Sequence, residues 1–405
     1  MQPHYRFAGF MGKRVHLGVT GSIAAYKALD LLRPLQEAGC LVSATLTDAA
    51  ARFVGSLSFE ALGASPVYSG MFDPRDGNPF GHLEPGQEAD VMAVVPATAA
   101  TLARLAFGLA DDMLSCQALA FPGPKIVAPA MNPRMWEAPA TRRNWQMIAD
   151  LGYVRVAPEC GHVACGDTGS GRLAPVDEIF AAILRAISPQ DLAGRRVLVT
   201  LGPTREPWDA VRFWSNPSSG LMGACMAMAA HLRGAEVTVV AGPTALTFPA
   251  AVTVVPVRTA REMFAAATGL WPDMDVACCA AAVADFRPVP FGDAKFKKAS
   301  GAEGPVVHFE ANPDILRTLG ESRREGQRLI GFAAETGDLQ AEAQRKLLAK
   351  RLDLIAANDI SRDGSGFCSG TNQMFVLDAQ GRRESWPRLD KTEVAWRIWD
   401  HLLLA

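Results

Sequence analysis

The stretch H-L-G-V-T-G-S-I-A-A-Y-K, residues 16–27, contains the turn on which the fold of the first half depends. A short run rich in β-forming residues stops at Gly21 and Ser22. A helical pattern then covers residues 24–38, and a second apolar run covers residues 41–46. This order of strand, glycine turn, helix and strand predicts a parallel sheet covered by helices, and therefore an α/β fold. Backbone amides at the start of the helix, with the Ser22 hydroxyl, would suit a phosphate group.

The same unit begins again in the second half of the chain. There R-R-V-L-V-T-L-G-P-T-R, residues 195–205, also ends a strand-like run at a glycine. A helical pattern at residues 222–233 and a strand-like run at residues 237–240 follow. We therefore expect two Rossmann-like α/β domains, although any α/β chain repeats this unit and the repeat does not prove a duplication.

Length and composition also indicate two globular domains. The chain has 405 residues, of which 49% are hydrophobic and 20% charged. Turn residues in S-P-Q-D-L-A-G, residues 188–194, place the boundary between the two repeats. We assign residues 1–190 to the first domain and residues 191–405 to the second. The formal net charge of -2 offers no electrostatic footprint for nucleic acid or for an anionic membrane.

The sequence does not suggest a membrane protein or an oxidising compartment. No apolar run approaches the ~20 residues that cross a bilayer. The eight cysteines are scattered, and none forms C-x-x-C. Cys278 and Cys279 adjoin within an apolar run, where burial as small hydrophobic side chains is favoured over pairing. We expect a reduced, cytoplasmic protein.

A rigid turn at P-A-M-N-P-R-M-W, residues 129–136, carries an amide and an indole. Pro129 and Pro133 keep the backbone around Asn132 out of a helix. Such a turn can hold a small polar ligand between Asn132 and Trp136. It can equally be an ordinary strand-to-helix loop that Asn132 caps.

Polar residues end three of the expected strands. Gly21 and Ser22 follow the first strand, and Thr47 follows the second. Thr98, in P-A-T, follows another at residues 91–95. In an open α/β sheet such carboxyl ends meet at the edge where ligands bind, although helix capping explains each residue taken singly. The turn at Gly21 is not G-x-G-x-x-G, so the dinucleotide fingerprint is absent.

The segment C-G-H-V-A-C-G-D-T-G-S-G-R, residues 160–172, contains four glycines, which predict a flexible flap. Cys160, His162 and Cys165 lack the spacing of a zinc site and a fourth ligand, so we do not expect a metal there. A single thiol with a pKa of about 8.5 would be protonated at neutral pH and suited to donating a proton.

Motifs in both halves occur together in one known group of enzymes. G-V-T-G-S-I-A-A-Y-K, P-A-T, P-A-M-N-x-x-M-W and A-C-G-D-x-G-x-G-R resemble the flavin-dependent cysteine decarboxylases that act on phosphopantothenoylcysteine. The second half carries G-P-T-R-E-P, S-N-x-S-S-G, A-A-V-A-D, K-x-K-K, N-P-D-I, G-F-A-A-E-T and A-N-D, which resemble phosphopantothenate–cysteine ligase. Over nearly its whole length, the chain resembles the bacterial bifunctional enzymes of coenzyme A biosynthesis.

For the first half, the resemblance implies a flavodoxin-like flavoprotein domain that binds FMN. In this family the substrate thiol is oxidised to a thioaldehyde, which accepts the electrons left by CO2. The enethiol is then reduced, and the resemblance makes Cys165 the proton donor. Asn132 would bind the carboxylate, and His82, in G-H-L-E-P, would be the catalytic histidine. The FMN-binding residues implied are Gly21, Ser22, Thr47, Thr98 and Ser115.

For the second half, the resemblance implies an α/β ligase domain that joins cysteine to 4'-phosphopantothenate through an acyl-cytidylate made from CTP. Lys295 would supply positive charge as pyrophosphate leaves, and Asn216 would handle the acyl-cytidylate. Mg2+ is also implied, with its protein ligands unassigned. The CTP-binding residues implied are Cys279, Ala280, Ala281, Asp285, Lys295, Pro313, Asp314, Ile315, Leu316, Phe332, Lys346 and Lys350.

One residue departs from the family pattern, because Leu221 follows S-S-G where a basic residue is common. One phosphate contact is therefore in doubt, and neighbouring lysines could compensate for it. The resemblance further implies a homo-oligomer built from trimers of the first half and dimers of the second.

Two other functions fit parts of the sequence. A flavin-binding regulatory protein without catalysis would need neither the pair Asn132 and Cys165 nor a complete ligase half. An NAD(P)-dependent oxidoreductase with two Rossmann domains would need the missing G-x-G-x-x-G. The absorbance spectrum of the purified protein would separate flavin from nicotinamide.

Overall fold

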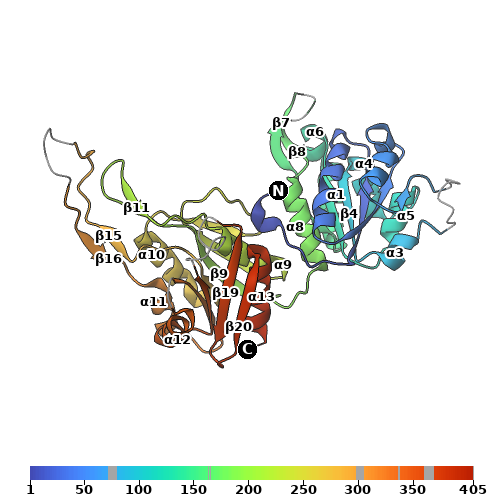
Figure 1. Ribbon diagram of the computed structural model, residues 1–405. Helices are drawn as coiled ribbons and strands as arrows, with labels where there is room; N and C mark the ends of the chain where they lie inside the picture. The colour runs from blue at the N-terminus through green and yellow to red at the C-terminus, as the bar shows by residue number, and fades with distance from the viewer. Residues whose placement is uncertain are drawn as a thin grey trace. The chain divides into compact units, whose positions relative to one another are not determined.

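The chain folds into two compact units (Figure 1). The computed structural model describes residues 1–71, 80–162, 164, 166–297, 305–335, 338–359 and 369–404. The first unit consists of Met1 and Arg6–Ser188, and the second consists of Gln2–Tyr5 and Pro189–Ala405.

Residues 2–5 belong to the second unit, whereas the sequence placed them in the first domain. They include the short 3-10 helix η1 (Pro3–Tyr5), which packs on helix α9 (Leu221–Leu232). His4 is fully buried there, with Nε2 2.8 Å from the carbonyl oxygen of Thr247. Burial of the aromatic side chains explains why the segment folds with the second unit.

A parallel sheet with the order β3-β2-β1-β4-β5-β6 forms the centre of the first unit. Its strands are β1 (Arg14–Val19), β2 (Leu41–Leu46), β3 (Val67–Tyr68), β4 (Val91–Ala97), β5 (Lys125–Pro129) and β6 (Val154–Arg155). The helices are η2 (Ile23–Tyr26), α1 (Lys27–Glu37), η3 (Ala50–Arg52), α2 (Ser56–Ala61), α3 (Glu84–Glu88), α4 (Ala99–Phe107), α5 (Met113–Ala120), α6 (Pro133–Glu137), α7 (Pro139–Asp150) and α8 (Val176–Ile187). A separate antiparallel hairpin consists of β7 (Glu159–His162) and β8 (Thr168–Arg172).

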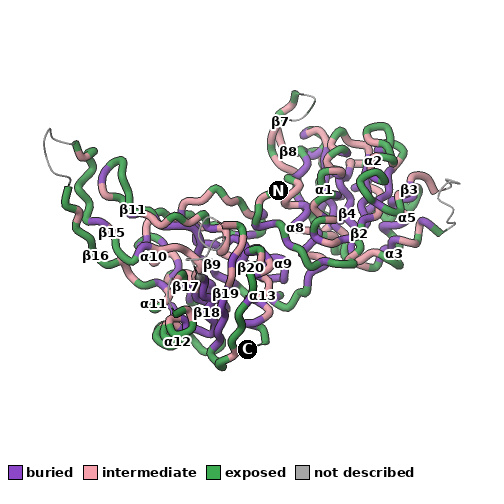
Figure 2. Tube along the Cα trace, in the orientation of Figure 1, coloured by how far each residue is buried: buried purple, intermediate pink, exposed green. Residues whose placement is uncertain are grey.

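Burial explains why these segments become strands and helices. All residues of the central strand β4 are buried, as expected for a strand covered on both faces (Figure 2). Helix α1 buries Ala28, Leu31, Leu32 and Leu35, which recur at helical spacing. Helices α1 and α8 pack together, and α4 packs with α7 around an apolar cluster.

The second unit contains a mixed sheet with the order β13-β12-β9-β14-β17-β18-β19-β20. The first six strands in that order are parallel to one another. Strand β19 is antiparallel to β18, and β20 is antiparallel to β19. The strands are β9 (Arg196–Leu201), β12 (Glu236–Ala241), β13 (Thr253–Pro256), β14 (Val276–Cys279), β17 (Arg328–Glu335), β18 (Leu354–Asp359), β19 (Thr371–Asp378) and β20 (Arg383–Asp390). The helices besides α9 are α10 (Ala260–Leu270), η5 (Trp271–Asp273), α11 (Ile315–Glu321), α12 (Leu339–Ala349) and α13 (Lys391–Leu403).

Helix α9 is the most deeply buried helix of this unit, because ten successive residues from Gly223 to Leu232 are buried. A Cβ atom on Gly223 would stand 2.5 Å from that of Leu201, so only glycine lets α9 approach strand β9 this closely. Helix α13 covers α9 from another side, and Trp399 Nε1 donates a 3.1 Å hydrogen bond to the carbonyl oxygen of Met226.

Two small antiparallel ribbons complete the second unit: β10 (Arg205–Pro207) with β11 (Phe213–Ser215), and β15 (Phe286–Pro288) with β16 (Phe309–Ala311). Nowhere in the described ranges is a helix long and apolar enough to cross a bilayer. The predicted α/β class, with a parallel sheet in the first half and an α/β domain in the second, is confirmed. The antiparallel pair β19–β20 was not foreseen from the sequence.

Candidate active sites

The carboxyl edge of the first sheet holds a cavity of about 700 Å³. Gly21, Thr47 and Thr98 line it, so three of the predicted FMN-binding residues meet at this edge. The volume lies in the range of cofactor sites. A Cβ atom on Gly21 would stand 2.4 Å from that of Ala49, so the turn needs glycine. Thr20 fixes the edge, because its hydroxyl donates to the carbonyl oxygen of Pro96 at 2.7 Å.

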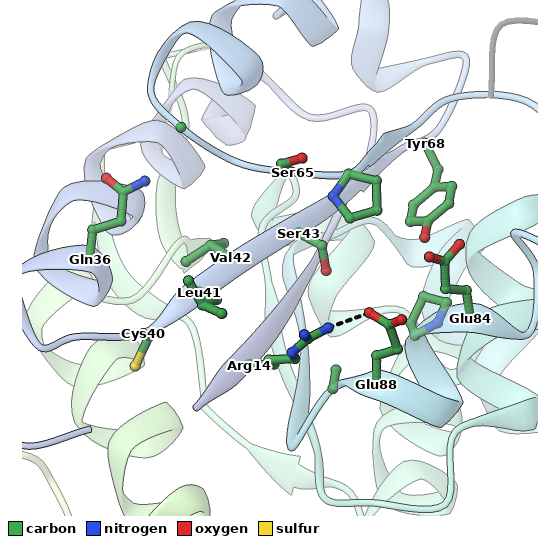
Figure 3. Close-up of a pocket in the computed structure, with 14 residues that line it drawn as sticks. Arg14, Gln36, Cys40, Leu41, Val42, Ser43, Ser65, Tyr68, Glu84 and Glu88 are labelled. Carbon is green, nitrogen blue, oxygen red and sulfur yellow. Dashed lines mark hydrogen bonds and ion pairs between the residues drawn. The ribbon is translucent and has the colours of Figure 1, made fainter. Parts of the chain in front are cut away.

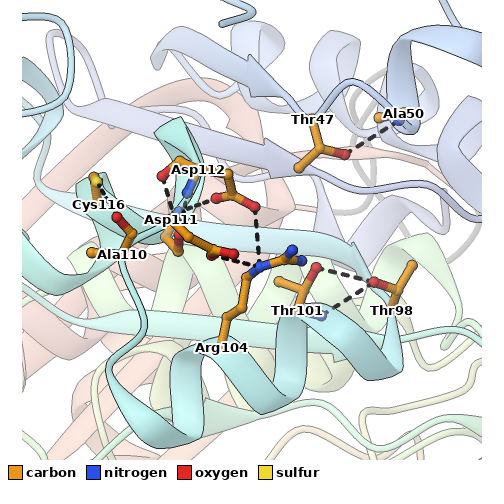
Figure 4. A network of polar contacts seen from close by, with 10 residues as sticks. Thr47, Ala50, Thr98, Thr101, Arg104, Ala110, Asp111, Asp112 and Cys116 are labelled. Atoms are coloured by element: carbon orange, nitrogen blue, oxygen red, sulfur yellow. Dashed lines mark hydrogen bonds and ion pairs between the residues drawn. The ribbon is translucent and has the colours of Figure 1, made fainter. Parts of the chain in front are cut away.

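Polar side chains in this cavity also organise the backbone around it (Figure 4). Thr98 caps helix α4, since its hydroxyl accepts from the amide of Thr101 at 3.3 Å. Thr47 accepts from the amide of Ala50 at 3.2 Å. Arg104 Nε lies 2.7 Å from a carboxylate oxygen of Asp111 at the cavity wall. The capping and ligand-binding interpretations of these threonines are therefore compatible, and the cavity suits a polar mononucleotide.

Ser115 lies beside this cavity without lining it. The residue is 3% exposed, and its hydroxyl accepts from the backbone amide of Asp112 at 3.2 Å in a capping box of α5. Ser22 lines a second cavity instead, described next.

A cavity of about 500 Å³ brings Ser22 close to Asn132 and to the β7–β8 hairpin. Asn132 Oδ1 accepts from the amide of Arg134 at 2.8 Å, and Nδ2 donates to Asp167 at 2.8 Å. The asparagine therefore caps α6 and borders a cavity at once. Gly171 on β8 holds the hairpin against this loop, because its carbonyl oxygen accepts from the amide of Met131 at 2.9 Å.

The two strands β7 and β8 lie in the Gly-rich segment that the sequence predicted to be a flap. His162 and Ala164 line the Asn132 cavity, and His162 Nδ1 lies 2.9 Å from the Thr168 hydroxyl. Cys165, the predicted proton donor, lies outside the described residues, as does Val163. Within the described ranges, no group of three His, Cys, Asp or Glu side chains could hold a metal ion.

His82 lies on the turn before α3 and is half-buried. It lines neither of the two cavities just described. A buried polar network supports the turn, because Gln117 Nε2 donates to the carbonyl oxygen of Gly81 at 2.9 Å, and Gln117 Oε1 accepts from the Thr45 hydroxyl at 2.6 Å. His16 joins the same network, and burial lowers the pKa of His16 to about 4, so that its imidazole is neutral at pH 7.

Figure 3 shows a further cavity of about 270 Å³ in the first unit. The ion pair between Arg14 and Glu88 borders it, together with Cys40 and Tyr68. Burial raises the pKa of Cys40 to about 12, so its thiol stays protonated and unreactive. None of the described site residues that the sequence singled out lines this cavity.

In the second unit a cavity of about 270 Å³ joins several of the predicted ligase residues. Asn216 is held at its rim, because Nδ2 donates to the carbonyl oxygens of Ala282 at 3.1 Å and Val283 at 3.2 Å. Lys346 lines the cavity and forms an ion pair with Glu335. The predicted residues that line it are Asn216, Ala280, Ala281, Asp285, Phe332 and Lys346.

Other predicted ligase residues lie outside this cavity. Lys350 pairs with Asp314 at 2.9 Å, and Asp314 caps α11. Lys295 is exposed, although the next residue, Phe296, is anchored by its amide to Asp209 at 3.1 Å. The predicted residues that do not line the cavity are Cys279, Lys295, Pro313, Asp314, Ile315, Leu316 and Lys350.

Several cavity residues were not assigned a role from the sequence. Asn358 lies in the A-N-D motif, which carried no role of its own. Asn372 on β19 and Lys391 at the start of α13 belong to no motif that we recognised. Only the tertiary structure identifies them as cavity residues, because they are polar residues that become buried when the C-terminal elements fold onto α9.

Comparison with known proteins defines the class to which these two units belong. Residues 10–188 match the flavoprotein family, and residues 192–404 match the family described as the DNA/pantothenate metabolism flavoprotein C-terminal domain. The fold and its cavities therefore belong to a flavoprotein domain joined to a pantothenate-metabolism domain.

Comparison with full-length relatives identifies the family more specifically than the two domain matches do. The chain is 39% identical over 390 residues to the coenzyme A biosynthesis bifunctional protein CoaBC of Bacillus subtilis, covering 95% of both chains. It is 40% identical over 372 residues to CoaBC of Escherichia coli K12, covering 91% of this chain and 92% of the relative. A crystal structure of the C-terminal domain of a CoaBC protein has 39% identity and a TM-score of 0.45, and it covers 53% of this chain and 97% of that one. The chain belongs to the family of bifunctional proteins of coenzyme A biosynthesis, which confirms the assignment made from the motifs.

Proposed function

We propose that the two domains catalyse consecutive steps of coenzyme A biosynthesis. The second domain ligates cysteine to 4'-phosphopantothenate through an acyl-cytidylate formed from CTP. The first domain then decarboxylates 4'-phosphopantothenoylcysteine to 4'-phosphopantetheine with FMN. The observation that carries this proposal is that each domain has its own cavity, with Asn132 beside one and Asn216 beside the other.

In the first domain, the chain's own residues would bind the substrate and deliver a proton. FMN, when bound, would accept the electron pair that the substrate thiol loses and would later return that electron pair. Asn132 is oriented by Arg134 and Asp167, so its amide can hold the substrate carboxylate until CO2 leaves. Cys165 on the flap is the acid that protonates the enethiol carbon, and His82 is the catalytic histidine.

Two of the cavities described in the first domain divide the FMN residues between them. Gly21, Thr47 and Thr98 suit the phosphate and ribityl chain, because they combine helix-start amides with hydroxyl groups. Ser22 lies at the cavity of Asn132. Ser115 would act by capping α5 next to this site.

In the second domain, the nucleotide would react next to Asn216. Fixed by two backbone carbonyls, Asn216 can retain the acyl-cytidylate while cysteine attacks. Lys295 is exposed, and it would supply positive charge to the leaving pyrophosphate once its segment closes over CTP. Cys279, residues 313–316 and Lys350 extend the predicted nucleotide site beyond the cavity wall. Mg2+, when bound together with CTP, would neutralise negative charge on the phosphates, and we assign it no protein ligands.

The family resemblance further suggests a cytoplasmic homo-oligomer, with trimeric first domains and dimeric second domains. Sedimentation of the full chain and of each domain tests this assembly, because monomeric domains would contradict it.

One incubation tests both activities. The purified protein is mixed with 4'-phosphopantothenate, cysteine, CTP and Mg2+, and products are followed by mass spectrometry. We expect 4'-phosphopantetheine, CMP and pyrophosphate from the wild type. The Cys165→Ser variant should instead accumulate an oxidised enethiol about two mass units lighter than the normal product, because a hydroxyl is a weaker acid than a thiol. Absence of any cysteine adduct in the wild-type reaction would refute the ligase assignment.

A further inference from the structure

A buried glutamine holds the turn that carries His82. Gln117 on helix α5 is fully buried, and its Nε2 donates a 2.9 Å hydrogen bond to the carbonyl oxygen of Gly81. Gly81 is itself buried and directly precedes His82 in the chain. A Cβ atom on Gly81 would stand 3.2 Å from the ring of Tyr68, so the turn packs closely against β3. The backbone beside His82 is therefore held by a side chain from another element.

The Gly81 carbonyl needs this side chain because the local sequence supplies no donor. In a helical turn a carbonyl oxygen accepts from the amide four residues later, and the Glu84 amide reaches the carbonyl oxygen of Phe80 in this way at 3.2 Å. The corresponding residue for Gly81 is Pro85, at the start of α3, which has no amide hydrogen. A buried carbonyl without a donor is destabilising, so Gln117 replaces the missing amide.

The neighbours of Gln117 give its amide a single orientation. Gln117 Oε1 accepts from the Thr45 hydroxyl at 2.6 Å, and His16 Nε2 lies 3.3 Å from the same oxygen. The Ser43 hydroxyl lies 2.8 Å from His16 Nδ1 and completes the chain of polar groups. Because a hydroxyl donates to Oε1, the amino group of the amide faces Gly81. Strands β1 and β2 thus fix the direction in which Gln117 donates.

Helix α5 also borders the cavity that we assign to FMN. Its first residues, Met113 and Leu114, line that cavity, and Ser115 caps the helix beside it. One short helix therefore sets the position of the cavity wall and, through Gln117, the position of the turn before His82.

We propose that Gln117 is a positioning residue for the decarboxylase reaction. By holding the Gly81 carbonyl, it fixes the backbone from which the His82 imidazole reaches the reacting substrate. Gln117 lines neither the FMN cavity nor the Asn132 cavity, so it acts through His82. This inference rests on the decarboxylase function proposed above, in which His82 is the catalytic histidine.

Kinetics of the full-length flavoprotein test this role. 4'-Phosphopantothenoylcysteine is supplied directly, and 4'-phosphopantetheine is measured by mass spectrometry. Gln117→Leu should lower kcat about ten- to a hundredfold, because a shift of about 1 Å in a catalytic group can cost about 10²-fold. The KM for the substrate and the flavin content should stay unchanged. A normal kcat in the folded variant would overturn the proposal.

Gln36→Leu is the matched control. Gln36 Nε2 also donates to a turn carbonyl oxygen of the same unit, that of Leu62 at 2.7 Å. The control loses the same kind of contact in a different turn and should keep the wild-type kcat. An equal fall of kcat in both variants would show that loss of any such contact impairs the domain, which would refute a specific role for Gln117.

Two double variants separate positioning from a general structural role. Pro85→Ala provides an amide four residues after Gly81, so it should restore part of the kcat lost in Gln117→Leu and leave the wild-type kcat nearly unchanged. His82→Asn removes the positioned group, so adding Gln117→Leu to it should lower kcat by less than about twofold. Absence of rescue by Pro85→Ala, or an equal loss with and without His82, would refute the positioning role.

If Gln117→Leu does not fold, Gln117→Met gives the same test, because its unbranched side chain adapts to an irregular space and donates no hydrogen bond. The two proposals fail in different ways. A wild-type protein that forms no 4'-phosphopantetheine from 4'-phosphopantothenoylcysteine refutes the decarboxylase function and this inference with it. An active wild type whose kcat is insensitive to the substitution of Gln117 refutes only the positioning role.

Discussion

Each domain begins with a strand that ends at a glycine turn, but in the second domain the β10–β11 ribbon lies between that turn and helix α9. In the first domain, helix α1 buries one stripe of side chains, and the cavity residues come from loops that follow β1, β2, β4 and β5. In the second domain, α9 is buried on all sides, and α13 and β19 reach its start. The comparison shows that a helix covered by later elements acquires cavity residues from those elements, far along the chain.

The two domains also differ in how each one holds the asparagine beside its cavity. Asn132 is held by a neighbouring amide and by the flap residue Asp167. Asn216 is held by two carbonyl oxygens of the loop after β14. The first is therefore held partly by the β7–β8 hairpin, whereas the second is held by the loop that follows a strand of the sheet.

The largest effect is expected from Asn132→Ala. The change removes the amide that we assign to the substrate carboxylate, so decarboxylation should fall by about 10³-fold or more, while CTP-dependent ligation continues. Product analysis by mass spectrometry should show accumulated 4'-phosphopantothenoylcysteine. If both activities disappear in a folded protein, the two domains do not work independently.

The buried His16 should make the first domain sensitive to acid. Its folded pKa of about 4 lies below the reference value of 6.5, so the unfolded chain binds the extra proton. The stabilisation is complete above pH 6.5 and is lost as the pH falls from 6.5 to about 4, a change of about 3 kcal/mol. Urea unfolding of the first domain, followed by bound flavin, measures this at pH 7 and pH 4.5.

His16→Leu is the control, because a leucine cannot take up the proton. The variant should show a smaller loss of stability between the two pH values. Burial and Arg382 also lower the pKa of His401 in the second domain, which is why the measurement must report on the flavin domain. Equal acid sensitivity of wild type and variant would contradict the role given to His16.

In the second domain, Lys295→Gln should suppress formation of the acyl-cytidylate about 100-fold, because a positive charge is lost where pyrophosphate leaves. Asn216→Asp should let the intermediate form but slow its use. Quenched reactions with labelled 4'-phosphopantothenate distinguish the two variants. Normal accumulation of acyl-cytidylate in the Lys295 variant would remove the lysine from the phosphate site.

The smallest effect is expected on flavin affinity, from a substitution in the glycine turn that follows β1. Gly21→Ala places a Cβ atom 2.4 Å from that of Ala49, so the turn must shift and flavin affinity should fall about tenfold. Gly55→Ala is the matched control, because a Cβ atom there meets nothing within 4 Å. Flavin fluorescence titration of both apoproteins gives the comparison. Equal affinities would show that this turn does not contact the cofactor.

The α/β class, the two domains and the family were all predictable, because they depend on local patterns. Gly21, Asn132 and Pro133 are constrained by backbone sterics over a few residues. The meeting of Gly21, Thr47 and Thr98 at one edge also followed from the sequence, since parallel strands bring their carboxyl ends together. The placement of Lys295 outside the ligase cavity did not follow, because a loop rich in glycine and proline carries no periodic pattern.

Other features required the folded chain. Asn372 meets Met222 across 150 residues of sequence, and residues 2–5 join the second unit through the buried His4. The antiparallel strands β19 and β20 and the helix α13 set which polar side chains are enclosed around α9. A sequence motif reflects turns and residue spacings that are determined within one short segment. Burial of a lysine or an amide depends on which distant apolar surfaces pack together, because the hydrophobic effect acts between segments without regard to their separation along the chain.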